Sequence, residues 1–187
     1  NRGVIERIEK NLGGKADNPV TLTHLQKTAL NHPDFCSKWD DRNPADKDLI
    51  IQGATSGGKT LLSELSILDC LGHGKKALVL VPLKALVHER YKQFIRDLAP
   101  NGEYNIYASS SDYLDMDERL IGGEYQVGIL VYEKLFAMLC QDHCMILDNC
   151  SLIVVDELSM LGKDERGPKL EIALEKAKTY TSSTTSN

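Results

Sequence analysis

The sequence lacks any apolar run that approaches the ~18 residues of a membrane span. Its first ten residues, NRGVIERIEK, also lack the apolar core of a secretory signal peptide. Positive charge is not in excess, because the formal net charge is −5 over 187 residues. We therefore expect no membrane partner and an intracellular location, cytoplasmic or nuclear. The charge argues against a uniformly basic surface but allows a local basic groove, since a net charge is an average.

A regular cysteine framework is also missing. The five cysteines form an odd count, and in an intracellular setting they are expected to be reduced thiols. Four potential metal ligands, Cys140, His143, Cys144 and Cys150, fall within eleven residues. Their spacing fits neither a zinc knuckle nor a four-cysteine iron–sulfur layout, so we favour free thiols and keep a metal site as the alternative.

Short apolar runs alternate with amphipathic stretches from residue 49 onward, without an internal repeat. Strands are expected at 49–52, 77–81, 104–109, 126–131 and 151–157. Helices are expected at 20–31, 59–71, 83–99, 132–140 and 167–178. Strands that are apolar on both faces indicate a buried, mostly parallel sheet with helices on both faces, a three-layer α/β/α fold.

The expected domain organisation has three parts. Residues 1–48 form an N-terminal helical and loop segment, residues 49–178 form the main domain, and residues 179–187 form a flexible tail. Ligands of such sheets bind beyond the carboxyl ends of the strands. Two polar segments stand at these ends, namely GATSGGKT at 53–60 and the acidic pair at 156–157.

The segment GATSGGKT fits the phosphate-binding pattern G-x-x-x-x-G-K-[ST] between an expected strand and an expected helix. Glycines let successive backbone N–H groups face phosphate oxygens, Lys59 can reach the β- and γ-phosphates, and the Thr60 hydroxyl can ligate Mg²⁺. A polar turn with an incidental lysine is the alternative. The candidate ATP-binding residues of this loop are Gly53, Ala54, Thr55, Ser56, Gly57, Gly58, Lys59 and Thr60.

The acidic pair follows the apolar run LIVV. Asp156 can hold Mg²⁺ directly or through water, and Glu157 can act as the general base that orients the attacking water. With Lys59, these two residues are the predicted catalytic set. A helix cap with a first-turn acid is the alternative. ATP is preferred to GTP because the sequence has no N-K-x-D guanine signature.

Four segments together resemble motifs I, Ia, Ib and II of superfamily-two DEAD/DEAH-box helicases, especially the Ski-two-like branch with its archaeal repair helicases. They are GATSGGKT, VPLKALVHERYKQF, VYEKL and VVDELSMLGKDERGPKLE. The resemblance covers about residues 20–178. It implies a RecA-like ATP-binding domain of an ATP-dependent helicase, with ATP and Mg²⁺ as cofactors. It also implies single-stranded nucleic acid as partner, with DNA slightly favoured over RNA.

Further site residues follow only from the resemblance. Gln26 stands where the family's glutamine reads the adenine. The nucleic-acid contacts are expected at Pro82, Leu83, Lys84, Ser110, Ser111, Asp112, Tyr132, Glu133 and Lys134. The alternative for the second motif is an amphipathic helix that packs Leu83, Leu86, Val87 and Phe94 on the sheet.

The sequence departs from the family in several respects, among them Val131 and Tyr132 in place of the Thr and Pro of motif Ib. Ser159 replaces the His or Asp that ends the DExH box, which puts the coupling between ATP and nucleic acid in doubt. The S-A-T motif and the second RecA-like domain with its arginine finger are not found, so this chain alone is expected to be nearly inactive. A different P-loop ATPase or remodeller, or a helicase-like docking module, remain the alternatives.

Overall fold

The computed structural model describes residues 21–32, 35, 48–54, 57–109, 114–162 and 167–184. Four strands form one sheet in the order β2-β3-β1-β4. Every pairing in this sheet is parallel. The strands are β1 (Lys76–Val81), β2 (Ile106–Ser109), β3 (Val127–Val131) and β4 (Cys150–Val155).

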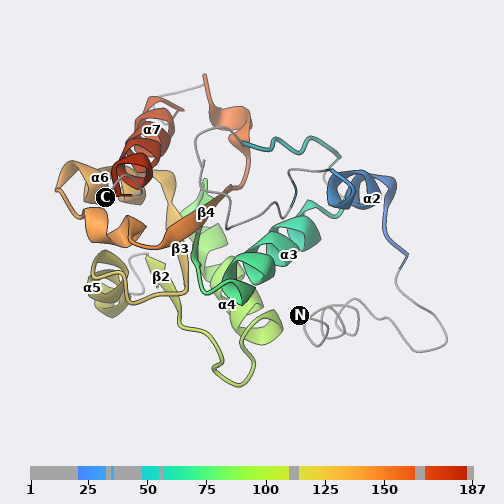
Figure 1. The fold of residues 1–187 in the computed structure, drawn as a ribbon, viewed down its shortest axis with the longest axis horizontal. Helices are drawn as coiled ribbons and strands as arrows, with labels where there is room; N and C mark the ends of the chain where they lie inside the picture. The colour runs from blue at the N-terminus through green and yellow to red at the C-terminus, as the bar shows by residue number, and fades with distance from the viewer. Residues whose placement is uncertain are drawn as a thin grey trace.

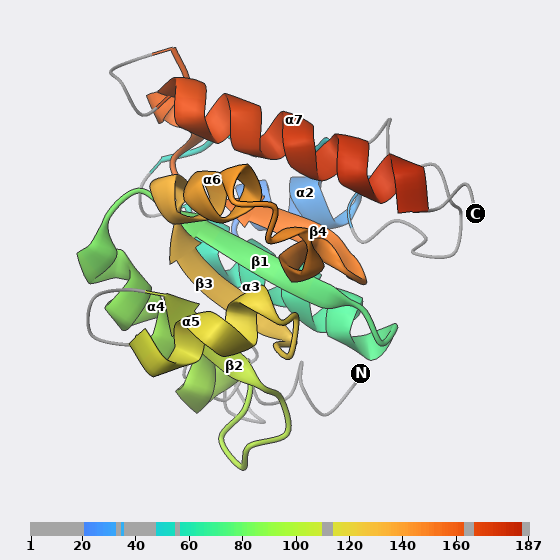
Figure 2. The ribbon, with the colours of Figure 1, turned by 90° about the vertical axis from the view of Figure 1, so that its left-hand side faces the viewer.

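Helices connect these strands and cover both faces of the sheet. In Figure 1, α5, α6 and α7 lie to the left of the strands, and α3 and α4 lie to the right. Figure 2 views the strands from the side of α5, α6 and α7. The α-helices are α2 (His24–Leu30), α3 (Lys59–Gly72), α4 (Lys84–Asp97), α5 (Leu114–Ile121), α6 (Tyr132–Cys140) and α7 (Gly167–Thr184). Two short 3-10 helices are η2 (Cys144–Leu147) and η3 (Leu158–Met160).

The core has two layers because successive side chains of a strand point to opposite faces. Val79 and Ile129 pack under α3 and α4, whereas Leu80 and Leu130 pack under α6 and α7. All four side chains are at most 3% exposed. The predicted α/β fold with a parallel sheet and helices on both faces is confirmed.

The helix α2 packs on α3 in a third, smaller cluster. Ala29, Phe35 and Leu62 form its buried centre, and Leu25 packs against them. Thr23 caps the helix by accepting the Gln26 N–H, and the Gln26 side chain accepts the Thr23 N–H in return. This capping box is readable in the sequence as T-x-x-Q, and it determines where α2 begins.

The strand predicted at 49–52 is not formed. Residues 48–54 have no regular structure, and Leu49 and Ile50 are 37% and 71% exposed. A strand needs a hydrogen-bonded neighbour, and among the described residues no strand pairs with this segment. The apolar run alone therefore gave the wrong prediction.

Two helical segments also differ from the expectation. The helix α5 was not predicted, because four charged residues interrupt its four apolar ones over only eight positions. The helix α7 continues to Thr184, although residues from 179 onward were expected to be flexible. Tyr180 explains the extension, because its ring packs on the core and its hydroxyl donates to Asp148 Oδ1 at 2.6 Å. Within the described ranges, no helix is long and apolar enough to cross a bilayer.

Candidate nucleotide and nucleic-acid site

The glycine-rich loop turns directly into α3. The Gly57 N–H donates to the Ala54 carbonyl at 2.9 Å, which closes a turn. Gly58 is the N-cap of α3 and has φ +78°, a left-handed conformation that glycine adopts without strain. Gly58 has no side chain that could cap the first N–H groups of α3, and such N–H groups can bind an anion.

Lys59 is folded back onto its own loop. Its Nζ donates to the Gly53 carbonyl at 2.7 Å and to the Ala54 carbonyl at 2.8 Å. The two carbonyls thus hold the ammonium group against the glycine-rich loop. Thr60 follows in the first turn of α3 and is half-buried.

The helix α2 covers the loop. The Thr23 hydroxyl donates to the Gly57 carbonyl at 3.1 Å, and the Gln26 Nε2 donates to the Gly58 carbonyl at 3.2 Å. Gln26 is 6% exposed, and its Oε1 is occupied by the Thr23 N–H at 2.8 Å. The Gln26 amide therefore holds the loop in this structure, and an adenine would have to displace one of these bonds.

Replacing Gly58 by alanine is expected to weaken nucleotide binding about tenfold or more. The new Cβ would lie 2.1 Å from Gln26 Nε2, so either the Gln26 amide would lose its bond to the Gly58 carbonyl or the loop would have to move. Gly74 is the matched control, because it has φ +69° and nothing within 4 Å of an added Cβ. Both variants should lose about 1–2 kcal/mol of stability to the left-handed backbone.

The measurement is the affinity of each variant for a fluorescent ATP analogue, beside its free energy of unfolding. The steric explanation predicts that only Gly58→Ala loses affinity. Equal affinity loss in both variants would show that backbone strain, not the contact with Gln26, accounts for the effect.

The two predicted carboxylates lie at the carboxyl end of β4. The Asp156 backbone is held on both sides, because its N–H donates to Leu80 O at 2.9 Å and its carbonyl accepts from the Tyr132 hydroxyl. Glu157 is exposed and has φ +59°, which is strained for a residue with a side chain. Ser159 is exposed within η3.

Three residues that the sequence reasoning missed join these elements. Arg90 Nη2 donates to Asp156 Oδ2 at 3.2 Å, and Arg90 Nη1 donates to Gln93 Oε1 at 2.9 Å. Gln93 Nε2 in turn donates to Glu64 Oε1 at 2.5 Å. Burial, together with the nearby Asp97 carboxylate, raises the pKa of Glu64 to about 7. Nothing in the local sequence pairs Arg90 with Asp156, since 66 positions separate them.

The predicted strand-contact segment of α4 is partly accessible. Leu83 is 51% exposed and Lys84 is exposed, whereas Pro82 is buried. Leu83 is the N-cap of α4 and provides no side-chain cap for the first N–H groups of the helix. The alternative that placed Leu83 on the sheet is wrong for this residue, although Val87 and Phe94 are buried there.

The predicted contacts on α6 need a correction. Tyr132 is fully buried, and its hydroxyl donates to the Asp156 carbonyl instead of facing a nucleic acid. Burial, with the neighbouring Asp156, raises its pKa. Lys134 pairs with Asp117 Oδ2 at 2.5 Å, and the Asp117 Oδ1 accepts from the Ser109 hydroxyl at 2.6 Å.

Several other predicted residues have less definite positions. Glu133 is half-buried in the first turn of α6. Five predicted residues lie outside the described residues, so their roles stay predictions: Thr55, Ser56, Ser110, Ser111 and Asp112.

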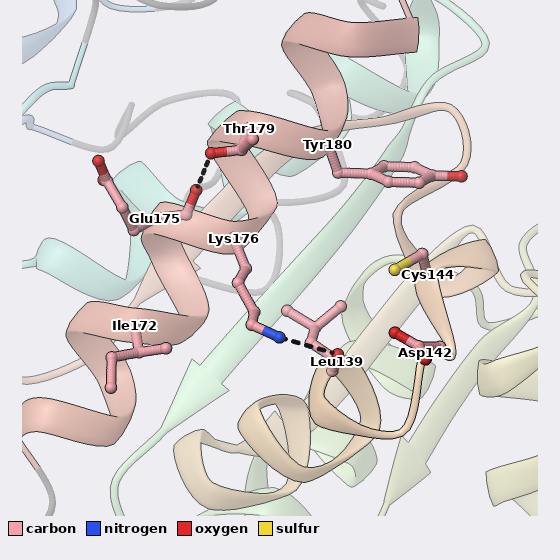
Figure 3. A pocket seen from close by; sticks show the side chains of 8 residues that line it. All are labelled: Leu139, Asp142, Cys144, Ile172, Glu175, Lys176, Thr179 and Tyr180. Carbon is pink, nitrogen blue, oxygen red and sulfur yellow. Dashed lines mark hydrogen bonds between the residues drawn. The ribbon is translucent and has the colours of Figure 1, made fainter.

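A pocket of about 480 Å³ opens elsewhere, between α6, η2 and α7. Figure 3 shows Leu139, Cys144, Ile172 and Tyr180 around it, with Lys176 donating to the Leu139 carbonyl. None of the predicted site residues lines this pocket. In the described part of the chain, no group of three or more His, Cys, Asp or Glu residues is arranged to hold a metal ion.

The loop at the start of α3, the carboxylates at the end of β4 and the parallel sheet between helices define a P-loop domain of the RecA-like type. Comparison with known proteins agrees. The model of the DEAD/DEAH box helicase family matches residues 38–187. The chain belongs to the DEAD/DEAH box helicase family.

Individual relatives refine this assignment. The chain is 34% identical over 134 residues to the ATP-dependent DNA helicase Hel308 of Methanocella arvoryzae, covering 70% of this chain and 18% of the relative. It is 36% identical over 129 residues to Hel308 of Thermococcus kodakarensis, covering 68% of this chain and 11% of the relative. The predicted resemblance to archaeal helicases of the Ski-two-like branch is confirmed.

A solved structure shows the same fold. The helicase Lhr of Mycobacterium smegmatis, bound to single-stranded DNA and AMP-PNP, matches with a TM-score of 0.54 and 26% identity. The match covers 69% of this chain and 18% of that chain. This chain therefore spans less than a fifth of the length of each of these three relatives.

Proposed function

We propose that this chain is the ATP-binding part of the motor of an ATP-dependent helicase that acts on single-stranded nucleic acid, with DNA favoured. The observation that carries the proposal is the arrangement of α2, the glycine loop and the β4 carboxylates. Thr23 and Gln26 hold the loop from one side, and Asp156 and Glu157 end the strand beside β1. Relatives that are named ATP-dependent DNA helicases support ATP and DNA as the ligands.

Lys59 acts on the phosphates. In the present structure its ammonium group donates to two carbonyls, at 2.7 and 2.8 Å, which carry only partial charges. The β- and γ-phosphate oxygens carry full charge and form stronger hydrogen bonds, so the ammonium exchanges partners when ATP enters. The uncapped N–H groups at the start of α3 add donors aimed at the same anion.

The donor set fits Mg²⁺, which prefers oxygen ligands. Thr60 offers a hydroxyl in the first turn of α3, and Asp156 offers Oδ1, which has no partner within the described part of the chain. When bound with ATP, Mg²⁺ neutralises charge on the phosphates and orients them. Holding Asp156 in place is the task of Leu80 and Tyr132, which bind its backbone.

Glu157 is the general base in this proposal. Its side chain is exposed beside Asp156, on a backbone that the Asp156 hydrogen bonds hold firmly. It accepts a proton from the attacking water. Gln26 contacts the adenine, and to do so its amide exchanges the Gly58 carbonyl or the Thr23 N–H for the base edge.

The nucleic-acid strand contacts the segment Pro82 to Lys84 at the start of α4. Backbone N–H groups and Lys84 provide donors for phosphate oxygens, which bind without reading sequence. Ser110, Ser111, Asp112, Glu133 and Lys134 belong to the same proposed surface. Lys134 reaches a phosphate only by leaving Asp117, so its contribution is smaller than that of a free lysine.

A second RecA-like domain of the full-length protein completes the ATP site. The relatives are several times longer than this chain, and an arginine from a second domain would add about 10³- to 10⁵-fold in turnover. This chain alone therefore hydrolyses ATP very slowly.

The test is ATP hydrolysis by the full-length protein with and without single-stranded DNA and single-stranded RNA. We expect turnover to rise with one polymer, and with DNA more than RNA. Turnover that ignores both polymers would favour a remodelling ATPase. No turnover at all would favour a helicase-like docking module. Ser159 in the DELS motif, in place of the family's His or Asp, is the feature that agrees with this alternative.

A further inference from the structure

Three side chains, those of Glu64, Gln93 and Arg90, connect the helix face of Thr60 to Asp156 through α4. Glu64 lies four residues after Thr60 on α3, and so on the same helix face. From Glu64 the hydrogen bonds run to Gln93, then to Arg90, and then to Asp156 on β4. The path therefore starts one helical turn from one proposed ligand and ends on the other.

Arg90 contacts one of the two oxygens of the Asp156 carboxylate. One of its nitrogens contacts Oδ2 at 3.2 Å, and the other is fixed by Gln93. The Arg90 side chain is 19% exposed and that of Asp156 is 32% exposed, so water screens this pair only in part. Glu64 is 6% exposed, so its side chain is fixed by packing. Through its hydrogen bond to Gln93, it holds the Arg90 guanidinium against the Asp156 carboxylate.

The charge of Arg90 opposes a metal at the same carboxylate. A monocation that contacts one carboxylate oxygen repels a dication on the other, and this repulsion falls only slowly with distance at partly buried sites. Arg90 also orients the carboxylate. Orienting the Asp156 carboxylate saves the entropy of one short side chain, which is a smaller effect than the repulsion between Arg90 and a dication. The net effect of Arg90 is therefore to weaken Mg²⁺ binding.

We propose that Arg90 is a positioning residue that holds Asp156 in the nucleotide-free protein and competes with Mg²⁺ for its carboxylate. The inference rests on the proposed function, since it takes Asp156 as a Mg²⁺ ligand. The helix α4 carries both Arg90 and the proposed strand contact at Lys84, about 9 Å apart along the helix axis. Arg90 thereby joins metal binding to the position of α4.

The experiment measures the Mg²⁺ concentration that gives half-maximal binding of a fluorescent, non-hydrolysable ATP analogue to the full-length protein. Arg90→Gln removes the charge and keeps hydrogen-bonding capacity. We expect it to lower the required Mg²⁺ concentration about three- to fivefold, as fits a partly exposed ion pair. Arg90→Lys keeps the charge, and we expect it to stay within about twofold of the wild type.

Arg96→Gln is the matched control, because Arg96 lies on the same helix with a 72% exposed side chain and pairs with Asp97. We expect it to leave the Mg²⁺ requirement unchanged. The melting temperature of each variant without nucleotide distinguishes competition with Mg²⁺ from a purely structural role of Arg90. A purely structural role would lower the melting temperature but leave the Mg²⁺ requirement as in the wild type.

An unchanged or higher Mg²⁺ requirement in Arg90→Gln would overturn the inference. Failure of the wild type to bind the analogue at any Mg²⁺ concentration would instead overturn the proposed function. Binding of the analogue in EDTA serves as the Mg²⁺-free reference. It should be equal in the wild type and Arg90→Gln, since the substitution leaves the glycine loop and Lys59 intact.

Discussion

Replacing Glu157 by glutamine should reduce nucleic-acid-stimulated ATP turnover of the full-length protein by about 10²- to 10⁴-fold. Glutamine has the same shape but cannot accept the proton of the attacking water. Binding of the ATP analogue should stay close to the wild type, because the phosphate loop and Lys59 are unaltered. The measurement is turnover at saturating ATP and DNA, beside the dissociation constant for the analogue.

The structure supports a local effect of this substitution. Glu157 is exposed, and the backbone before it is held by hydrogen bonds from Asp156 to Leu80 and from Tyr132 to Asp156. Glu171→Gln is the matched control, since it removes the same charge from an exposed position on α7. Turnover of Glu157→Gln within tenfold of the wild type would show that another group activates the water.

Replacing Glu64 by glutamine should stabilise the protein by about 2–3 kcal/mol at pH 8 and have little effect at pH 5. Burial raises the pKa of Glu64 from 4.5 to about 7, with Asp97 adding to the rise, while Gln93, Arg90 and Arg96 oppose it. A rise of this size corresponds to about 3 kcal/mol of free energy.

The direction follows from proton linkage. Between pH 4.5 and 7 the folded state keeps a proton on Glu64 that the unfolded state releases, so stability falls as the pH rises through this window. Above pH 7 the folded protein holds a buried carboxylate, which glutamine avoids. The amide of glutamine still offers an oxygen to the Gln93 Nε2, which now donates to Glu64 at 2.5 Å.

Urea unfolding at pH 5, 6.5 and 8 measures the effect. Glu89→Gln is the control, because Glu89 is exposed on the neighbouring α4. The prediction fails if the wild type and Glu64→Gln lose stability equally between pH 5 and pH 8.

Much of the architecture was readable in the sequence. The strand β3 and, after Lys76, the strand β1 have no polar side chain, and α3, α4 and α6 have a local helical pattern, so the positions of these elements were predicted to within a few residues. The phosphate loop and the acidic pair are short motifs whose chemistry depends on neighbouring residues. The predictions of the strands and helices succeeded because the information lies within a few residues of each element, whereas the roles of the loop and the acidic pair stay predictions.

Other predictions failed where a local pattern competes with distant contacts. Residues 49–52 are apolar enough for a strand, but pairing decides whether a strand forms. Tyr132 sits in a family motif, yet its hydroxyl lies against the carbonyl of Asp156. Tyr180 extends α7 through a contact with Asp148.

The sequence by itself therefore determined the class of fold and the family, and it predicted which residues bind phosphate and metal. Only the tertiary structure decided how these ligands are held. The links from Gln26 to Gly58 and from Arg90 to Asp156 span 32 and 66 positions. Such links depend on how the helices pack on the two faces of the sheet. Side-chain periodicity shows which face of a helix is buried, but it does not show which element that face contacts.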